Sequence, residues 1–562
     1  MQLRFILQKP LLLSLLINLG FLALCLGLGG VHFGCIDDYF MAAVVTGAYG
    51  GQFDAHTLFV NGIYAYFLKP FYVLFPSVGW YSIFELLGVF VAFTASTYCL
   101  LRNQCHKLST CVAIFLLACM APAFYLQLGF TQCAAALTVA GILLVYVGDN
   151  ECKKTQLFLG ALLLVCGMIF RREGFLLGVP FLAMLLIVST IEKRRFCKWT
   201  VVVLLTCFAA YQGLQNFNQN LFNNNEFSYY LAYQGPRAML GDGAYYDSKN
   251  VYDELEERGM SGRDFDLLQQ WVFYDTDAYS LDSLKPIVNV INRNRYDLNY
   301  AKLPLQLFFV IANSFWGINA WCWGLLCIFL FIGRARRANL YTWGSLALIA
   351  LCLSYLLLVN RVVGHVENSI WLYAIFCSIP FIKSVDYNEV KFKKVTRVIC
   401  ILSATCFVLA YMSLPKIESN RMLFGLPKKS EDLQQIVNIV KSNPNNVYLF
   451  PISSYMEYAL FYGNLLEAVT PKSLGNIIPI GYWNINHPGM IQEMNSRGVL
   501  NPLKDIIKEN VFVIDEDYKL PLQNFYQRHY GDSIAVDTVV KFGDKSLLKY
   551  SRVNLSGEAE NE

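Results

Sequence analysis

Residues 11–40 read LLLSLLINLGFLALCLGLGGVHFGCIDDYF, an apolar run that ends close to two adjacent acids. A helix that crosses a bilayer needs about 20 mostly apolar residues, because the bilayer offers no water to satisfy its backbone. The run from 11 to 31 meets this requirement. A cleaved signal peptide, or a lipoprotein signal ending at Cys35, is the alternative. The run is, however, longer than a usual signal core, and no small-residue cleavage pattern precedes Cys35.

The composition of the whole chain is that of a membrane protein. Of its 562 residues 56% are hydrophobic and 15% are charged, where a soluble protein carries about 25% charged residues. Several soluble domains would each need a polar surface that this composition cannot supply. Intrinsic disorder is excluded on the same grounds. The 45 Lys and Arg against 41 Asp and Glu leave a net charge of +4, too little over this length to indicate nucleic acid as a partner.

Eleven runs are apolar enough to be spans, although the fifth is short: 11–31, 81–101, 109–126, 131–148, 156–170, 174–191, 199–215, 310–333, 341–358, 368–383 and 397–414. Short cytoplasmic loops are enriched in Lys and Arg. With the N-terminus inside, every even-numbered span is followed by a basic loop. Eleven spans then place the C-terminus outside, together with the loops 32–80 and 216–302. We therefore expect a multi-pass protein of the plasma (inner) membrane.

The composition changes after Pro415, where charges of both signs become frequent. A capped amphipathic helix is predicted after Ser430, strands at 447–450 and 511–514, a short helix from Pro502 through Ile507, and a hairpin of 538–541 with 547–550. None of the 17 cysteines falls in 216–302 or 415–562. The predicted fold is thus a polytopic all-α membrane domain, 1–414, followed by a small extracytoplasmic α/β domain, 415–562, without disulfides.

Asp37 and Asp38 are the sharpest candidate for chemistry, because they follow the first span directly. A carboxylate at the rim of a low-dielectric region can have a raised pKa and act as a general base. Asp is also a favoured residue at the start of a helix, so a purely structural role in capping is the alternative. The sequence alone does not choose between these interpretations.

Several cations are predicted at the same side of the membrane. Arg171 and Arg172 end the fifth span, Arg361 and His365 follow the ninth, and His56 lies in the first external loop. Arginine on the external side is unusual, because Lys and Arg are enriched in cytoplasmic loops. Guanidinium groups on the external side could bind a lipid phosphate. Extension toward lipid headgroups, or pairing with nearby glutamates, is the alternative for the arginines. For His56 the alternative is an ordinary surface histidine.

These features together resemble the GT-C superfamily of integral-membrane glycosyltransferases. The resemblance rests on the acidic pair Asp37-Asp38 in the first external loop, the multi-span body, arginines near external helix ends and a C-terminal extracytoplasmic domain. The chain also looks like uncharacterised bacterial members, in which an Asp-Asp-Tyr segment precedes a loop resembling Asp54-x-His56…Asn61…Pro76…Trp80-Tyr81.

The resemblance implies transfer of a sugar from a polyprenyl-phosphate donor to a glycan, lipid or protein acceptor at the external face, as in cell-envelope polysaccharide biosynthesis. Asp37 would be the catalytic base and Asp38 would orient it or exchange roles with it. Arg171, Arg172 and Arg361, with His365 and His56 nearby, would stabilise the departing lipid phosphate. Some relatives use a divalent metal and others need no cofactor, so metal dependence stays open here.

Three other functions are compatible with parts of the pattern. A lipid-linked saccharide flippase or transporter would place ionisable residues inside its spans, where Glu85 is the clearest instance. A polysaccharide polymerase or ligase would use the same donors and external arginines. A membrane-anchored binding protein would depend on its C-terminal domain and not on Asp37 or Asp38.

Overall fold

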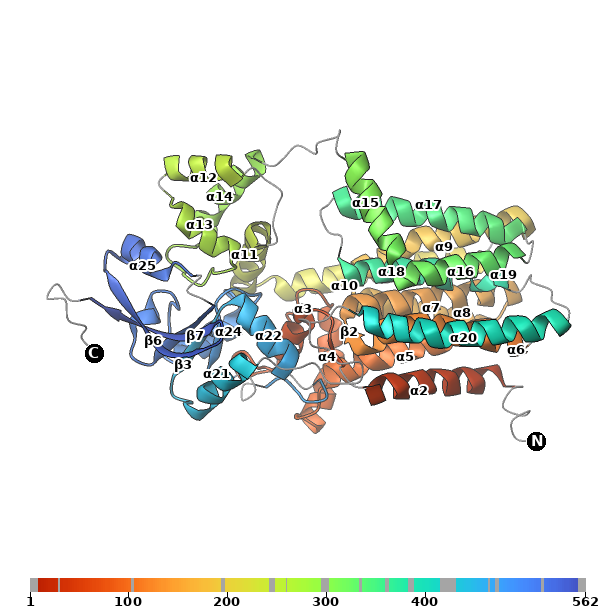
Figure 1. The fold of residues 1–562 in the computed structure, drawn as a ribbon, viewed down its shortest axis with the longest axis horizontal. Coiled ribbons are helices and arrows are strands. Elements are labelled where there is room, and N and C mark those ends of the chain that lie inside the picture. The colour runs from red at the N-terminus through yellow and green to blue at the C-terminus, as the bar shows by residue number, and fades with distance from the viewer. Residues whose placement is uncertain are drawn as a thin grey trace.

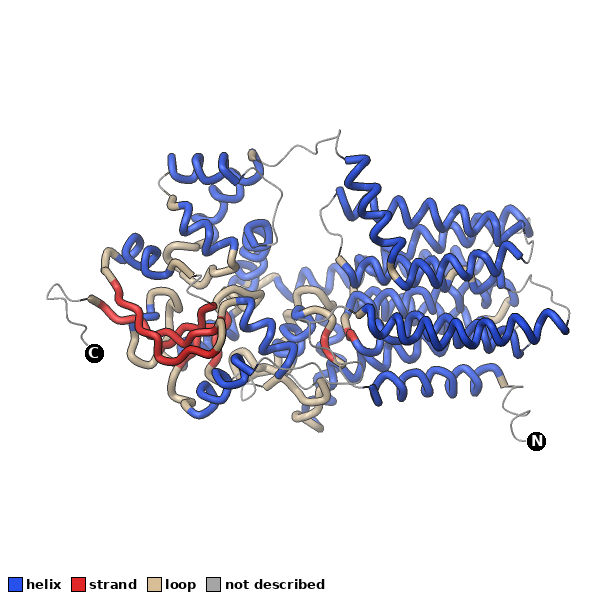
Figure 2. Tube along the Cα trace, in the orientation of Figure 1, coloured by secondary structure: helices blue, strands red, loops and turns tan. Residues whose placement is uncertain are grey.

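The computed structural model is mostly helical, with a small sheet near the C-terminus (Figure 2). It describes residues 9–28, 31–102, 106–193, 198–241, 248–258, 260–294, 303–332, 336–358, 363–382, 389–414, 431–462, 465–470, 475–516 and 520–553.

The first three-quarters of the chain supplies a bundle of long helices (Figure 1). Its members are α2 (Pro10–Leu28), α5 (Trp80–Leu101), α6 (His106–Leu126), α7 (Phe130–Glu151), α8 (Lys154–Phe170), α9 (Arg172–Lys193), α10 (Lys198–Phe222), α15 (Leu303–Trp316), α16 (Ile318–Ile332), α17 (Arg336–Leu358), α18 (Gly364–Phe376), α19 (Ile379–Ile382) and α20 (Glu389–Ser413). All eleven predicted runs are largely helical. Within the described residues, seven of these helices are long and apolar enough to cross a membrane.

The run predicted as one span at 310–333 is not continuous. It is divided between α15 and α16, which are bent by 76° at the break. Gly317 lies at this break, and its N–H donates to the carbonyl of Ser314 at 3.2 Å, a tighter turn than that of an α-helix. Glycine is among the poorest helix formers, so the bend falls where the helix is weakest. If the pair counts as one span, the candidate spans number eight.

Small residues let the central helices approach closely. The apolar run of α7 is buried along its whole length, and α7 packs against α8 at two facing glycines. A Cβ atom on Gly141 would lie 2.8 Å from the carbonyl oxygen of Gly160, and one on Gly160 would lie 2.9 Å from that of Gly141. Close backbone approach at small residues is a usual way for apolar helices to associate in lipid.

The segments predicted to be external gather at one end of the bundle (Figure 1). The first loop contains β1 (His32–Phe33), α3 (Ile36–Val45) and α4 (Gly62–Leu74), and β1 pairs in parallel with β2 (Gln127–Leu128). The second contains α11 (Asn225–Gly241), α12 (Ser248–Glu257), α13 (Gly262–Gln269) and α14 (Leu281–Arg293). The third is the C-terminal domain.

The C-terminal domain has a five-stranded mixed sheet in the order β4-β3-β5-β7-β6, with β3 parallel to β4 and β5 and with β7 antiparallel to β5 and β6. Its elements are α21 (Glu431–Ser442), β3 (Val447–Phe450), α22 (Ile452–Tyr462), β4 (Ile477–Pro479), α24 (Pro488–Ser496), η1 (Asp505–Ile507), β5 (Val511–Glu516), α25 (Leu522–Tyr530), β6 (Ile534–Phe542) and β7 (Lys545–Arg552). The predicted strands and hairpin are confirmed. The helix predicted from Pro502 is wrong, since only the 3₁₀ turn η1 forms there.

The described residues of the segment 216–302 pack on the C-terminal domain. The N–H of Phe273 donates to the carbonyl of Ile480 at 3.1 Å. The hydroxyl of Tyr230 on α11 donates to the carbonyl of Trp483 at 2.9 Å. These contacts join two regions that are far apart in the sequence into one structure at the end of the bundle.

A substitution of Gly481 tests the packing between the segment 216–302 and the C-terminal domain, because the Cα of Gly481 faces the backbone of Trp271. A Cβ atom at 481 would overlap the carbonyl oxygen of Trp271. We expect Gly481→Ala to destabilise the protein by about 1–3 kcal/mol, the usual cost of overpacking. Thermal unfolding of the detergent-purified protein would show a lower midpoint. Gly235→Ala on α11 is the matched control, because nothing lies within 4 Å of its Cβ position. Equal midpoints for the two variants would contradict this account of the packing.

Candidate active site

Asp37 and Asp38 lie in the first turn of α3. Cys35 is the N-cap of this helix, and its Sγ accepts a hydrogen bond from the N–H of Asp37 at 3.3 Å. Neither acid is therefore the cap, although both suit the positive end of the helix. The pairing of β1 with β2 holds the start of α3 against the end of the bundle, so both carboxyl groups are positioned by bundle contacts as well as by their own helix.

The two carboxyl groups lie in different surroundings. Asp37 is half-buried, and its Oδ1 accepts hydrogen bonds from the indole Nε1 of Trp483 at 2.7 Å and from the hydroxyl of Tyr482 at 3.3 Å. Asp38 is fully buried, and its Oδ1 accepts from the hydroxyl of Tyr81 at 3.0 Å and from the N–H of Phe130 at 3.2 Å. Asp37 is held by the C-terminal domain and Asp38 by the bundle.

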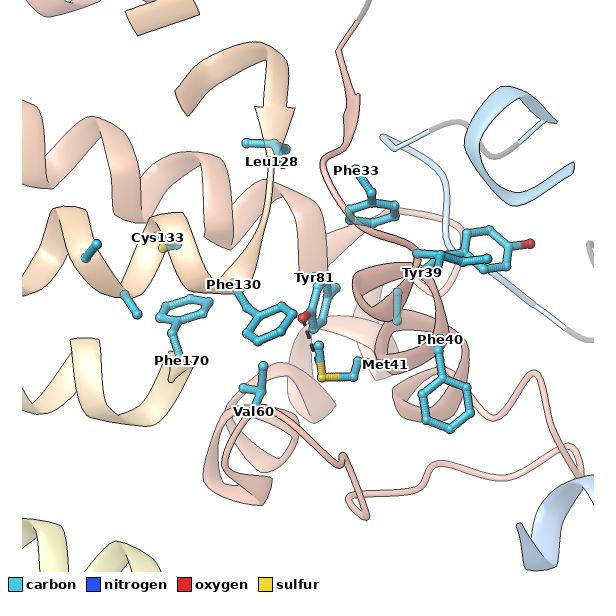
Figure 3. Packing of buried hydrophobic residues seen from close by; sticks show 14 of the residues in the cluster. Phe33, Tyr39, Phe40, Met41, Val60, Tyr81, Leu128, Phe130, Cys133 and Phe170 are labelled. Atoms are coloured by element: carbon cyan, nitrogen blue, oxygen red, sulfur yellow. Dashed lines mark hydrogen bonds between the residues drawn. The ribbon is translucent and has the colours of Figure 1, made fainter. Parts of the chain in front are cut away.

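Burial is the main influence on Asp38. It raises the pKa of this carboxyl to about 7, and the charge of Asp37 acts in the same direction, while hydrogen bonds from Glu85, Tyr81 and Phe130 oppose the rise. Figure 3 shows the apolar packing here, with Tyr81 beside Phe130 and with its hydroxyl directed toward Met41. Burial raises the pKa of a carboxyl group because a low-dielectric environment disfavours its charged form.

Arg171 contacts the start of α7. It is the C-cap of α8, its guanidinium lies 4.8 Å from the centre of the Phe130 ring, and its Nη1 donates to Thr131 Oγ1 at 2.5 Å. Because the N–H of Phe130 binds Asp38, one residue of α7 contacts both the acid and the cation. The acid from the first loop and the guanidinium from the end of the fifth apolar run are thus related through Phe130 and do not contact each other directly among the described interactions.

The other predicted cations behave differently. Arg172 pairs with Glu173 of its own helix, α9, and its Nη1 donates to Gln215 Oε1 of α10 at 3.3 Å. His365 begins α18 near Arg171, and burial together with the charge of Arg171 lowers its pKa to about 4. Arg361 lies outside the described residues. Arg171 and Arg172 thus share Glu173 as an ion-pair partner, and His365 is close enough to Arg171 to be affected by its charge.

His56 ties the first loop to the second. Its Nδ1 lies 2.5 Å from Asp54 Oδ1 and its Nε2 lies 3.0 Å from the carbonyl of Leu221. Its ring stacks on Phe227 with the centroids 3.4 Å apart. Both nitrogens thus have partners within the chain, and side-chain accessibility of the pair is low. This arrangement differs from the ordinary surface histidine that was the alternative.

Arg237 of α11 was not singled out in the sequence. Its side chain is fully buried, and its guanidinium lies 3.8 Å from the ring centre of Trp483 and 4.6 Å from that of Trp271. Its Nε donates to Gln234 Oε1 at 2.9 Å. Trp483 therefore contacts Asp37 through its N–H and Arg237 through its ring. The feature that distinguishes Arg237 from other arginines is its burial, and burial cannot be read from a single sequence.

His487 was also missed. It is fully buried among aromatic rings that include Phe40, Tyr49 and Tyr230, and its Nε2 lies 3.5 Å from Asp54 Oδ2. Burial lowers its pKa to about 4, although the charge of Asp54 opposes this. Neither ring nitrogen makes a hydrogen bond to the part of the chain that the structure describes. The imidazole is thus neutral at neutral pH.

Asp54 lies between these two histidines. Burial alone would raise its pKa, but the hydrogen bond to His56 and the charges of His487 and His56 outweigh burial, so the pKa of Asp54 is lowered. Among the described residues, no group of three or more His, Cys, Asp or Glu side chains is arranged to hold a metal ion.

The buried imidazole of His487 predicts a pH-dependent stability. Its folded pKa of about 4 lies below its ordinary value of 6.5, so the unfolded chain binds the proton more tightly. Stability should fall as the pH falls from about 6.5 to about 4, by on the order of 3 kcal/mol from this group. We expect His487→Phe to keep or raise the unfolding midpoint at pH 7 and to flatten its decline toward acid.

His56→Phe is the contrasting variant. It removes the side-chain partner of Asp54, which keeps the backbone N–H of residue 56, and the partner of the Leu221 carbonyl. We therefore expect a loss of about 1–3 kcal/mol at pH 7. Thermal unfolding of the detergent-purified proteins over this pH range measures both. An unchanged acid slope in His487→Phe would contradict the assignment of a neutral, buried imidazole.

Comparisons of the chain with family models, with curated proteins and with solved structures found no match in any of the three. The chemistry of the site is therefore inferred from its own residues.

Proposed function

We propose that this chain is a membrane glycosyltransferase of the GT-C type, which moves a sugar from a polyprenyl-phosphate donor to an acceptor hydroxyl. One observation carries the proposal. The half-buried carboxylate of Asp37 is next in sequence to the buried Asp38, and Phe130 contacts both Asp38, through its N–H, and Arg171, through its ring. A base and a cation are the two groups that transfer from a phosphate-linked sugar requires.

The proposal includes an orientation. The N-terminus would lie inside, eleven spans would follow, and the C-terminal domain would lie outside the plasma membrane. Two features support it. The loops 32–80 and 216–302 gather with the C-terminal domain at one end of the bundle (Figure 1). The connection that carries Lys153 and Lys154 lies at the far end of α7 from Phe130, as the enrichment of cytoplasmic loops in basic residues requires.

In this proposal Asp37 accepts the proton of the acceptor hydroxyl. The hydroxyl oxygen forms a bond to the anomeric carbon, and the bond from that carbon to the phosphate oxygen breaks. The electron pair leaves with the lipid phosphate, whose growing negative charge Arg171 stabilises. Trp483 and Tyr482 orient the carboxylate through their hydrogen bonds. Asp38 is fully buried, so it positions its neighbour and does not meet the acceptor.

A location at the membrane surface suits such a donor. Its prenyl chain stays in the lipid, so its phosphate remains near the ends of the spans, where Arg171 terminates α8. A guanidinium binds phosphate oxygens through paired, charge-assisted hydrogen bonds. His365, kept neutral by burial and by Arg171, can donate one further hydrogen bond at the same place without adding charge.

Asp37→Asn removes the base while keeping an oxygen that can accept from Trp483. We expect sugar transfer to fall by about 100- to 10,000-fold, the usual contribution of a general base, with an unchanged unfolding midpoint. The measurement is transfer from polyprenyl-phosphate-linked hexoses and pentoses by the purified protein in lipid. Asp282→Asn on α14 makes the same chemical change at a side chain that is 91% exposed, and it should leave transfer intact. Full activity in Asp37→Asn would exclude this mechanism, and lipid-linked sugar crossing the membrane without transfer would favour a flippase.

Arg171 and Arg172 form a natural pair of variants. Arg171→Ala should raise the KM for the lipid-phosphate donor by about 10- to 100-fold, because a hydrogen bond to a charged group contributes about 1.5–3 kcal/mol. Arg172→Ala should change the donor KM much less, since this side chain donates to Gln215 of α10, whereas Arg171 contacts Phe130 and Thr131 at the start of α7. Steady-state kinetics with donor and acceptor varied separately tests both. Equal effects of the two variants on the donor KM would contradict the assignment of Arg171.

A further inference from the structure

Glu85 of α5 faces Asp38 at the end of the bundle. Both side chains are fully buried. Glu85 lies one helical turn after Tyr81, whose hydroxyl donates to Asp38, and the two carboxyl groups are close enough to affect each other's ionisation. The chain therefore places two acids side by side where water does not reach them. A hydrogen bond between two carboxyl groups needs a proton on one of them, because ionised carboxylates only accept.

The donors around the pair are unevenly distributed. Asp38 Oδ1 receives the hydroxyl of Tyr81 and the N–H of Phe130. Within the described part of the chain, Asp38 Oδ2 and both oxygens of Glu85 receive no N–H or O–H from any other side chain or from the backbone. A buried carboxylate without donors is very unfavourable, so full ionisation of both groups is excluded on physical grounds.

No cation within the described residues contacts the pair. The titratable groups that face it are Cys35 at the N-cap of α3, Asp37 from α3, Tyr64 from α4, Tyr81 from α5 and Cys133 from α7. None of them carries positive charge. Arg171 is separated from Asp38 by Phe130, over whose ring its guanidinium lies. The site is thus complete only with one proton.

We propose that Asp38 and Glu85 form a buried proton-binding site, in which Glu85 carries the proton and donates it to Oδ2 of Asp38. The hydrogen-bond donors around the two acids decide which of them carries the proton. Asp38 accepts two other hydrogen bonds, which stabilise its ionised form, whereas Glu85 accepts none from the described residues. Glu85 is then a neutral acid that connects α5 to α3.

The site has a consequence that rests on the proposed glycosyltransferase function. Since Asp38 accepts from Tyr81, Phe130 and Glu85, no oxygen of it is available to an acceptor hydroxyl, and Asp37 is left as the base. Glu85 is in this sense a positioning residue: it holds the first turn of α3, and therefore Asp37, against α5.

Infrared spectroscopy of the purified protein in detergent at neutral to mildly alkaline pH tests the proton directly. We expect a carbonyl stretching band of a protonated carboxylic acid in the wild-type protein and its loss in Glu85→Gln. Asp38→Asn should keep the band but shift it, since the acid then loses its carboxylate acceptor. Glu367→Gln is the control, because this glutamate also lies at the start of a bundle helix but accepts from Ser314. It should leave the band unchanged.

The opposite outcomes overturn the proposal. A band that survives in Glu85→Gln and disappears in Asp38→Asn would place the proton on Asp38. A band that neither variant changes would exclude a shared proton. This result does not depend on sugar transfer, so it stands even if the proposed function fails.

The positioning role has its own readout. Glu85→Gln still offers an N–H to Asp38 and should keep transfer near the wild-type level, whereas Glu85→Ala should lower kcat by about 10-fold or more with little change in the donor KM. Equal loss in both variants at unchanged unfolding midpoints would overturn the positioning role while leaving the spectroscopic result intact.

Discussion

The hydrogen bond from the Trp483 indole to Asp37 is the contact on which the arrangement of the site depends. It joins the C-terminal domain to the first loop, while the ring of the same tryptophan lies over the guanidinium of Arg237 from the second loop. A half-buried carboxylate needs such donors, because burial without them is costly. Three segments that are distant in the sequence are thus held together by the need to satisfy one charge.

Two neighbouring acids acquire different roles from their surroundings. Asp37 faces the C-terminal domain and keeps part of its surface accessible, whereas Asp38 turns into the bundle, where burial raises its pKa. Phe130 lies between the buried acid and Arg171: its N–H donates to Asp38, and the guanidinium of Arg171 lies over its ring. The same end of α7 therefore organises the base, the neighbouring acid and the cation proposed for the lipid phosphate.

Predictions from local pattern succeeded where local interactions decide the structure. The strand at 447–450 matches β3 at both ends, and the hairpin of β6 and β7 forms as its alternating residues and turn indicate. The run 310–333 failed as a single helix, because an apolar average does not register the local turn at Gly317. The helix expected from Pro502 shortened to a 3₁₀ turn, although proline is favoured at a helix start.

The sequence by itself determined that the chain is apolar enough for a membrane and which residues form its long helices. It also determined that Asp37, Asp38 and Arg171 belong to the same end of the helix bundle. These follow from composition and from periodicities of a few residues, which act locally. Only the tertiary structure decided that Asp38 is buried against Glu85, that Arg172 turns away, and that Arg237 and His487 lie beside the first loop. Such contacts join residues that lie 43 to 433 positions apart. No short pattern encodes them, because their energy depends on burial and on partners supplied by the whole fold.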